Sequence, residues 1–488
     1  MRPSFRLPPP VKLMFPVGSL LDIPTGEYLK GTHDQRVLLG GISMITGIVG
    51  PGNSFKTTLM RFMVLSAINR IFSRAQDELY YSSYDTEINA NDHRNAKLTL
   101  IFDHLKDRDI LQEGIWQITN KDIYTGNEYW AEIKKYLKSK RENKKARLYK
   151  TAFLDRDGVS PMTTLCPSFG DIDSLSQFVT ADVEKTMETT ELGESAGNTI
   201  FMRQGLAKAR LLMEMPTVIA GGMHYELFTA HVGATITIPT GPGAPPPRKQ
   251  LQLMPAGDVI KGVSNNFFYL LHNLWYILSA RPFVNRDTKA PEYPYEPGDE
   301  IAGDNDLMCL TMKQLRGKNG SSGYVIEQMV SQREGVLPYL SEFHYVKTNG
   351  RFGLEGSDRN YALSLVPDVS LSRTSVRKKL RESPKLQRAV ELTAELCQLG
   401  IFHPTLKDVL MTPAELKKAL EDKGYDWEFL LTQTRSWHTL DDEEAPLYPF
   451  STLDMCRAAR GEYTPYWLEA DNKTVKKQYA ALKGIING

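Results

Sequence analysis

The amino-acid sequence predicts an α/β protein built on a mostly parallel β-sheet. Between residues 36 and 100 an apolar strand, a glycine-rich loop, a helix and a second strand follow one another, and the same alternation returns between residues 170 and 224. Strands that alternate with helices are typical of a parallel sheet, because each helix carries the chain back across it. The 488 residues, 41% hydrophobic and 24% charged, fit a globular protein of about three domains.

Each element of the first alternation has its own signal. Residues 42–49 are mostly apolar, as for a buried strand, and residues 57–71 are apolar nearly all round, as for a helix packed inside a domain. Residues 78–84 then form the second predicted strand. Prolines near the start of the chain disfavour regular structure, so residues 1–35 are interpreted as an arm whose segment 17–24 is suited to docking on a neighbour.

Charge, cysteines and hydropathy exclude several classes of protein. Lysine plus arginine number 59 and aspartate plus glutamate 58, so any contact with nucleic acid must use local positive charge. The four cysteines form no C-x-x-C pair, which excludes a zinc ribbon and a redox motif. No run reaches the roughly 18 apolar residues of a membrane helix. We therefore expect a cytoplasmic protein with no membrane partner and no signal peptide.

Two segments of unusual composition interrupt the alternation. Residues 131–150 carry nine lysines or arginines, which predicts a solvated helical face or, alternatively, an auxiliary nucleic-acid patch. Residues 225–263 contain the run GPGAPPP, which suits neither a helix nor a central strand. A loop of this length inside a compact domain is usually functional or disordered.

The strongest motif lies between the first predicted strand and the first predicted helix, which is the context that a P-loop requires. It comprises the residues Gly50, Pro51, Gly52, Asn53, Ser54, Phe55, Lys56, Thr57 and Thr58. Glycines let successive N–H groups face a phosphate, and the helix that follows adds the positive end of its dipole. Lys56 is expected to reach the β- and γ-phosphates and Thr57 to hold magnesium. Phe55 stands where the usual motif has glycine.

This motif resembles the P-loop of RecA-type recombinases, and its Ser-Phe-Lys variant is similar to that of the phage UvsX-type recombinases. The resemblance covers roughly residues 18–345. It implies a RecA-like P-loop ATPase core with ATP and Mg²⁺ as cofactors. It also implies a DNA-dependent ATPase that assembles as a homo-oligomeric helical filament, or a ring, on single-stranded DNA. Such a protein pairs that strand with double-stranded DNA and promotes strand exchange, here in a phage-infected bacterial cell.

Within the resemblance, three residues take roles in the ATP site. Glu87 matches the family's glutamate that activates the attacking water. Asp173, in the segment FGDIDSL, matches the aspartate that holds magnesium, and Asp155 is its competitor because it also follows an apolar run. Residues 215–220 resemble the strand that precedes the family's ATP sensor, which assigns the sensor role to His224.

The resemblance also implies groups that act on a neighbour and on DNA. Arg316 and Lys318 match two cations that reach the γ-phosphate of the adjacent subunit, although a basic hairpin turn is the alternative interpretation. DNA loops are expected at residues 188–200 and 225–263. The residues expected to contact DNA are Arg203, Arg248, Lys249 and Lys261.

We therefore divide the chain into an oligomerisation arm (1–35), an ATPase core (36–345) and a mostly helical C-terminal region of unknown function (346–488). The core carries inserts at residues 131–168 and 281–300 that a minimal RecA core lacks. Two other functions remain open at this stage. One is a DnaB-like hexameric replicative helicase, and the other is a RecA-like mediator that uses nucleotide as a structural switch.

Overall fold

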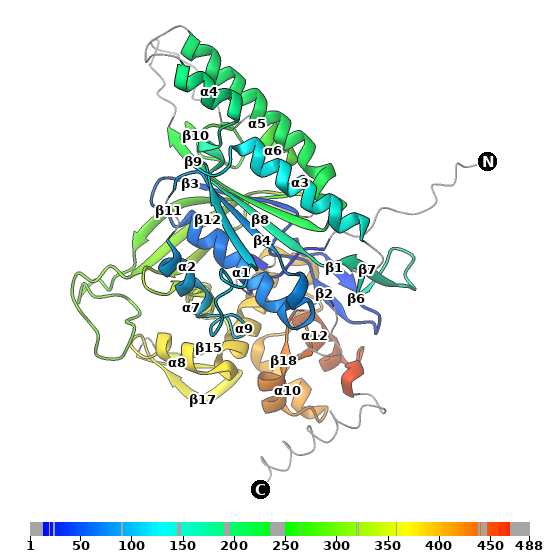
Figure 1. The fold of residues 1–488 in the computed structure, drawn as a ribbon. Helices are drawn as coiled ribbons and strands as arrows, with labels where there is room; N and C mark the ends of the chain where they lie inside the picture. The colour runs from blue at the N-terminus through cyan, green and yellow to red at the C-terminus, as the bar shows by residue number, and fades with distance from the viewer. Residues whose placement is uncertain are drawn as a thin grey trace, which may run out of the picture.

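The fold is given by a computed structural model, shown in Figure 1. It describes residues 13–18, 20–22, 25–88, 91–143, 148–189, 196–234, 249–263, 265–318, 320, 322–357, 359–437, 440 and 447–468. Within these ranges no helix combines the length and the apolar character needed to cross a membrane.

A large, mostly parallel sheet forms the centre of the described chain. Its strands lie in the order β14-β13-β12-β11-β3-β9-β8-β4-β5, with β10 beside β9. Neighbours from β11 to β5 run parallel, whereas β10, β12, β13 and β14 pair antiparallel. The bounds are β3 Ile45–Gly50, β4 Tyr81–Asp85, β5 Trp116–Asn120, β8 Ser168–Asp173, β9 His224–Ala234, β10 Asp258–Ile260, β11 Asn273–Pro282, β12 Leu307–Gly317, β13 Val325–Ser331 and β14 Gly335–Val336. The predicted α/β class with a mostly parallel sheet is confirmed.

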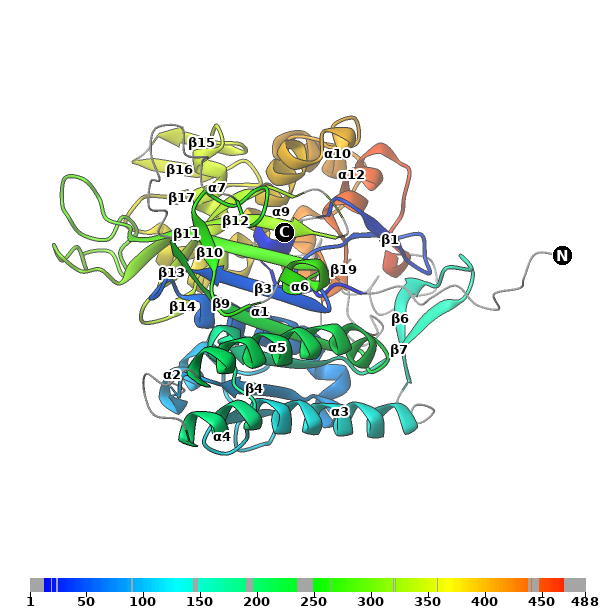
Figure 2. The ribbon, with the colours of Figure 1, turned by 90° about the horizontal axis from the view of Figure 1, so that it is seen from above.

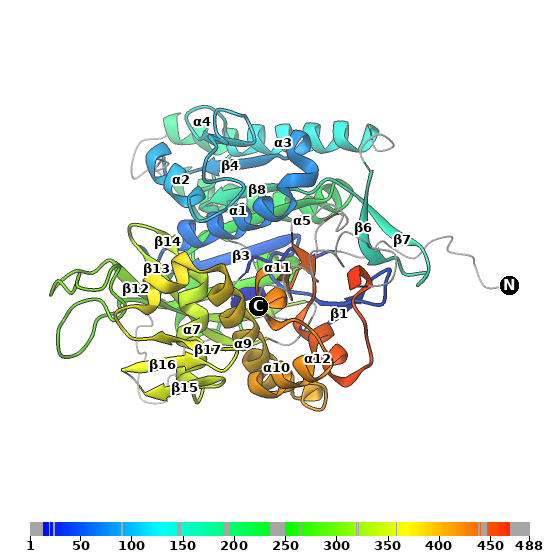
Figure 3. The same cartoon turned by 90° about the horizontal axis from the view of Figure 1, so that it is seen from below.

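Helices cover both faces of this sheet. Helices α1 (Lys56–Ala75) and α2 (Asp92–Thr99) follow strands β3 and β4 (Figure 3). Helices α3 (Gly126–Glu142), α4 (Ala181–Thr189) and α5 (Ala196–Ala220) are grouped on the other side (Figure 2). This division follows from right-handed crossovers, because the chain steps outward from β3 to β5 and then returns toward β11. All six residues of β3 are buried, as expected for a strand covered on both faces.

The strand predicted at residues 215–220 is wrong. Helix α5 continues through Pro216 to Ala220, and strand β9 begins only at His224. The buried residues Leu211, Met215 and Ile219 recur every four positions, which places them on one helical face. As a consequence, residues 225–234 belong to a central strand and not to the loop expected at 225–263. The stretch 235–248 of that loop lies outside the described residues.

The described part of the predicted arm packs on its own chain. The peptide groups of Phe15 and Ile42 exchange hydrogen bonds of 2.9 and 2.7 Å, and Gln398 donates to the carbonyl oxygen of Leu20 (2.7 Å). Val17 and Leu21 are fully buried in the main core. The suggestion that segment 17–24 docks on a neighbour is therefore not supported by its described residues. Residues 1–12 lie outside the described ranges.

The C-terminal region is less helical than predicted. Strands β15 (Leu354–Ser357), β16 (Asn360–Leu363) and β17 (Val366–Leu371) form a separate antiparallel sheet. Helices dominate only before and after it. They are α7 Pro338–Thr348, α8 Val376–Glu382, α9 Pro384–Phe402, α10 Pro413–Asp422, α11 Trp427–Gln433 and α12 Thr452–Arg460. These elements lie at the end of the molecule opposite α4 and α5 (Figure 1).

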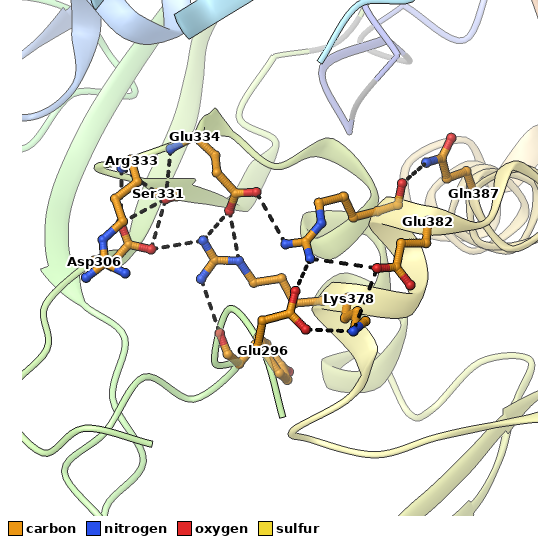
Figure 4. Close-up of polar contacts among 11 residues, drawn as sticks. Glu296, Asp306, Ser331, Arg333, Glu334, Lys378, Glu382 and Gln387 are labelled. Carbon is orange, nitrogen blue, oxygen red and sulfur yellow. Dashed lines mark hydrogen bonds and ion pairs between the residues drawn. The ribbon is translucent and has the colours of Figure 1, made fainter. Parts of the chain in front are cut away.

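The two predicted inserts have different structures. Residues 131–168 include the end of α3 and a hairpin of β6 (Leu148–Leu154) and β7 (Pro161–Leu165), which lies to one side of the central sheet (Figure 2). Insert 281–300 is tied to helix α8 (Figure 4). There Glu296 pairs with Lys378 at 2.9 Å and also with Arg381. The second insert therefore packs with the C-terminal region.

Remaining short elements complete the described chain. The small strands are β1 Tyr28–Lys30, β2 Arg36–Leu38, β18 Thr434–Arg435 and β19 Tyr448–Pro449, and helix α6 spans Asn265–Leu270. A second apolar core of buried residues joins β12, β13 and α7 to α8–α12. Because this core shares strands with the central sheet, the boundary predicted at residue 345 does not separate two independent cores.

Candidate nucleotide-binding site

The predicted P-loop connects the carboxyl end of β3 to the first turn of α1. A side chain at Gly50 would approach Ser54 Oγ within 2.9 Å and Ile277 within 3.1 Å, so the position needs glycine. By contrast, a side chain at Gly52 would meet no atom within 4 Å, which leaves the outer part of the loop open. Phe55 takes the left-handed φ of 62°, the region that glycine usually occupies. The substitution of glycine by Phe55 is therefore accommodated in a strained conformation.

Lys56 points back into the loop. Its Nζ donates to the carbonyl oxygen of Pro51 (2.7 Å), and its side chain is buried. Burial lowers the pKa of Lys56, while the negative charges of Asp173 and Glu87 oppose that shift. A buried cation that donates to a backbone carbonyl at the start of a helix is suited to meeting an anion.

Asp173 joins the first turn of α1 to the sheet. Its Oδ2 accepts a hydrogen bond from the hydroxyl of Thr57 (2.6 Å), and its Oδ1 accepts one from the hydroxyl of Thr229. Asp155, the competitor, lies beyond β6 in the separate hairpin, where its N–H bonds the carbonyl of Ser160 (2.8 Å). The geometry therefore favours Asp173 as the partner of Thr57.

Glu87 lies beside the same edge of the sheet. Its N–H donates to Asp85 Oδ1 (3.0 Å), and its Oε1 lies 2.7 Å from Nε2 of His231. Because a carboxylate only accepts, Nε2 carries the proton. Burial would raise the pKa of Glu87, but the hydrogen bond from His231 and the charge of Lys56 act against it, and the pKa is lowered. Glu87 is therefore ionised at neutral pH.

His224, predicted as the sensor, lies at the opposite edge of the sheet because it is the first residue of β9. It is fully buried, with Nδ1 3.0 Å from Ser168 Oγ and Nε2 2.9 Å from Glu226 Oε2. Lys140 donates to the same Ser168 hydroxyl (2.9 Å). Burial, assisted by the charge of Lys140, lowers the pKa of His224 to about 3, so the ring is neutral. His224 belongs to a buried network that ties α3 to the sheet.

His231 takes the place that His224 was expected to fill. It is paired with Gly50 in the parallel ladder between β9 and β3, so it stands directly beside the start of the predicted P-loop. A strand assignment that began at His224 would have found it, because residues 227–230 are a short run rich in apolar residues that ends at this histidine.

Arg94 is a second residue that the sequence analysis missed. It lies on the first turn of α2 and donates from Nη2 to the hydroxyl of Thr58 (3.0 Å). Thr58 directly follows the two residues expected to hold phosphate and magnesium. An exposed guanidinium at this distance adds positive charge to the mouth of the site.

Arg316 and Lys318 lie at the amino edge of the sheet, away from the predicted P-loop. Arg316 pairs with Leu274 in the β11–β12 ladder, and Leu274 pairs in turn with Gly47, three residues before the end of β3. Nε of Arg316 donates to Leu271 O (3.2 Å). Three residues of strand span roughly 10 Å, so neither cation reaches the loop of its own chain. Arg316 lies near the end of β12 and Lys318 directly after it, where the chain turns toward β13, which also fits the alternative interpretation of a basic hairpin turn.

The predicted DNA-contacting residues are only partly described. Lys249 and Lys261 are exposed, and the N–H of Lys261 donates to the carbonyl oxygen of His231 (2.8 Å). Arg203 lies on α5, but its side chain is outside the described parts, as is the whole of Arg248. Of the loop predicted at 188–200, residues up to 189 and from 196 belong to helices α4 and α5. Residues 190–195 lie outside the described ranges.

The oxygen donors at Thr57 and Asp173 fit magnesium. Mg²⁺ prefers hard oxygen ligands and usually binds through one or two protein groups together with phosphate oxygens. Within the described ranges there is no cluster of three or more His, Cys, Asp or Glu residues that could hold a metal ion by itself. The site therefore suits a cation that arrives with a phosphate group.

No family model matches the sequence, and no curated protein matches it significantly.

Proposed function

We propose that the protein is a RecA-type DNA-dependent ATPase that assembles on single-stranded DNA and promotes homologous pairing and strand exchange. The observation that carries this proposal is the convergence of Lys56, Thr57, Asp173 and Glu87 at the carboxyl edge of one parallel sheet. These residues come from three segments of the chain that are far apart in sequence. Ligands bind at this edge in open α/β sheets.

The strand order brings the residues of the proposed ATP site together. If β5 is left out, the parallel strands are numbered first to fifth along the chain as β3, β4, β8, β9 and β11. Across the sheet they lie in the order β11, β3, β9, β8, β4, so the strand that leads into the predicted P-loop is inside the sheet. The glutamate follows the second strand, and the aspartate ends the third. Glu87 and Asp173 therefore stand on neighbouring strands, which brings the predicted base and the predicted magnesium ligand together.

The roles of the side chains follow from their positions. Lys56 and the N-terminus of α1 would bind the phosphates of ATP, and Thr57 and Asp173 would hold the magnesium ion. Mg²⁺ when bound neutralises charge on the phosphate oxygens. Ionised Glu87 accepts a proton from the attacking water, and His231 fixes the orientation of its carboxylate. Arg94 adds positive charge near Thr58.

His231 also connects the ATP site to the predicted DNA loop. Its strand β9 leads directly into the segment that begins at residue 235, and its carbonyl oxygen accepts from Lys261 on the returning side. A change at Glu87 on binding or hydrolysis of ATP is thereby passed to the base of this loop. Lysines in the loop would contact the phosphate backbone of DNA and would not read its sequence. Homologous pairing requires this, because base pairing itself checks the sequence.

Arg316 and Lys318 support a site shared between subunits. Their position at the opposite edge suits a head-to-tail arrangement in which one copy presents them to the ATP of the next. The test is to mix Arg316→Ala with Glu87→Gln, each inactive alone. Mixed assemblies regain turnover if one protomer supplies the glutamate and the other the arginine. A mixture as inactive as its components would contradict a shared site.

An image of the protein with ATP and single-stranded DNA separates the recombinase from the hexameric helicase. The recombinase forms an open helical filament, whereas a helicase of the DnaB type forms a closed ring.

A further inference from the structure

Strand β13 has an unpaired edge over its first half. On one side it pairs with β12 along its whole length, but on the other side β14 covers only Val330 and Ser331. The register with β12 is unbroken from Val325 to Ser331. The register therefore shows which N–H and C=O groups of β13 point away from β12 along the uncovered edge.

Hydrogen bonds at the two ends of the strand fix which residues face outward. Gln314 N–H donates to the carbonyl oxygen of Tyr324 (2.8 Å), so Tyr324 faces β12. Met329 faces away, because its N–H donates to Ser341 Oγ (2.8 Å) and its carbonyl accepts from Leu337 (3.0 Å). Backbone direction alternates along a strand, so Val325 and Glu327 face outward as Met329 does. Within the described chain no residue hydrogen-bonds to their outward peptide groups.

A cavity of about 340 Å³ lies directly beside these two residues. Its walls come from the start of β13, the last turns of α7 and the end of α9. The residues that matter for the argument are Tyr324, Val325, Glu327, Tyr345, Ile401 and Phe402. Val325 and Ile401 are 46% and 48% exposed, which leaves apolar surface uncovered at the rim. The volume is of the order that pockets for a ligand or a large side chain usually have.

Two tyrosine hydroxyls at the cavity lack a partner. The hydroxyls of Tyr324 and Tyr345 are buried, and neither makes a hydrogen bond within the described residues. Tyr345 as a whole is only 6% exposed. An unsatisfied buried hydroxyl is unfavourable, so rotation of either tyrosine side chain toward an acceptor placed in the cavity would gain affinity. Peptide carbonyls are such acceptors, and a chain lying along the β13 edge would bring them close.

From this arrangement we propose that the edge of β13 at Val325 and Glu327 binds an extended peptide segment of a partner protein by strand addition. The peptide pairs its backbone with these two residues and places a large apolar side chain in the cavity beside Tyr345 and Phe402. Among the described residues that line the cavity Glu327 alone is charged, and its carboxylate lies 3.2 Å from both Arg281 Nη2 and His344 Nε2, so the side chain that enters the cavity is uncharged. This surface is separate from the proposed ATP site and does not depend on the proposed function.

The test is a selection of random twelve-residue peptides displayed on phage against the full-length protein, followed by affinity measurements on synthetic copies of the enriched peptides. Val325→Pro removes the outward N–H but no bond to β12, because Val325 does not donate to that strand. We expect Val325→Pro to weaken binding at least 10-fold, and Val325→Thr, which keeps the N–H, to weaken it less. Unchanged melting temperatures confirm that both variants fold.

Methylation of single peptide nitrogens in the selected peptides supplies the second measurement. Strand addition predicts that methylation abolishes binding at every other position, whereas a peptide held only by its side chains tolerates most methyl groups. The absence of any enriched peptide, equal binding by Val325→Pro, or a methylation profile without alternation each overturns the proposal. Self-association of the wild type that Val325→Pro abolishes would assign the edge to a second copy instead.

Discussion

His231 and Glu87 are joined by a hydrogen bond of 2.7 Å that spans from β9 to the second residue after β4, across the end of β8. The bond fixes a carboxylate directly beside the predicted P-loop. It also links that carboxylate to the strand that continues into the predicted DNA loop. This one contact therefore connects the proposed ATP site to the strand that leads into the predicted DNA loop.

Replacing Glu87 by glutamine separates binding from hydrolysis. The amide keeps an oxygen that accepts from His231, but it cannot take a proton from water. We expect Glu87→Gln to bind ATP normally and to lose turnover by roughly 10²–10⁴-fold, the usual contribution of a general base. Asp77→Asn, an exposed carboxylate before β4, is the matched control and should turn over normally. Equal activity of both variants would remove Glu87 from its role.

Alanine substitution of the two histidines of β9, His224 and His231, should have different effects: one on stability and the other on turnover. His231→Ala frees the Glu87 carboxylate, so we expect turnover to fall roughly 10–100-fold with an unchanged melting temperature. His231→Gln, which keeps a donor, should recover part of the loss. His224→Ala breaks the buried network with Ser168 and Glu226 and should cost roughly 2–4 kcal/mol of unfolding free energy. Full turnover by His231→Ala would contradict the role given to His231. An unchanged unfolding free energy of His224→Ala would contradict the role given to the buried network.

At position 55 we expect glycine to give a more stable protein than alanine, which is the reverse of their usual order. At a φ of 62° an L-residue costs about 1–2 kcal/mol that glycine does not. Both Phe55→Gly and Phe55→Ala lose the same packing against the core, so their difference isolates the backbone strain. We expect Phe55→Gly to be more stable than Phe55→Ala by roughly 1 kcal/mol in urea unfolding. An alanine variant at least as stable as the glycine variant would exclude strain at this position.

Asp171 should make stability depend on pH. Burial raises its pKa to about 7, against the lowering effect of Arg61 and of hydrogen bonds from Ser83 and Tyr81. The folded state therefore retains a proton that the unfolded state releases near pH 4. The stabilisation is complete below pH 4 and is lost as pH rises to 7, by up to about 1.4 kcal/mol per pH unit. Denaturant unfolding of Asp171→Asn should lack this contribution. Parallel pH profiles for the two proteins would contradict the shift.

The sequence was sufficient to predict where the candidate site residues lie when they belong to short contiguous motifs. Lys56 and Thr57 follow β3, Asp173 ends β8 and Glu87 follows β4, and the parallel sheet brings those strand ends together. Sequence reasoning failed where a local signal pointed the wrong way. Residues 215–220 were assigned to a strand from their resemblance to a family motif, yet helix α5 continues through Pro216 to Ala220.

Because of that single error the sequence analysis chose His224 in place of His231, the histidine seven residues later that lies beside the predicted P-loop. Starting β9 too early placed His224 at a strand end, whereas the true strand begins there and ends beyond His231. The position of Arg94 beside Thr58 was also beyond reach, because it depends on how α2 packs on α1 and no motif marks it. Likewise, nothing in the composition of residues 346–375 separates a small antiparallel sheet from helices.

The central claim is that ATP is bound by the loop ending at Lys56 and that its hydrolysis responds to DNA. The most direct measurement is ATP turnover with and without single-stranded DNA for the wild type, Lys56→Ala and Lys418→Ala, an exposed lysine of α10 used as control. We predict turnover that single-stranded DNA stimulates in the wild type and in Lys418→Ala, and none in Lys56→Ala. Turnover by Lys56→Ala equal to that of the wild type, or no hydrolysis by any of the three proteins, would contradict it.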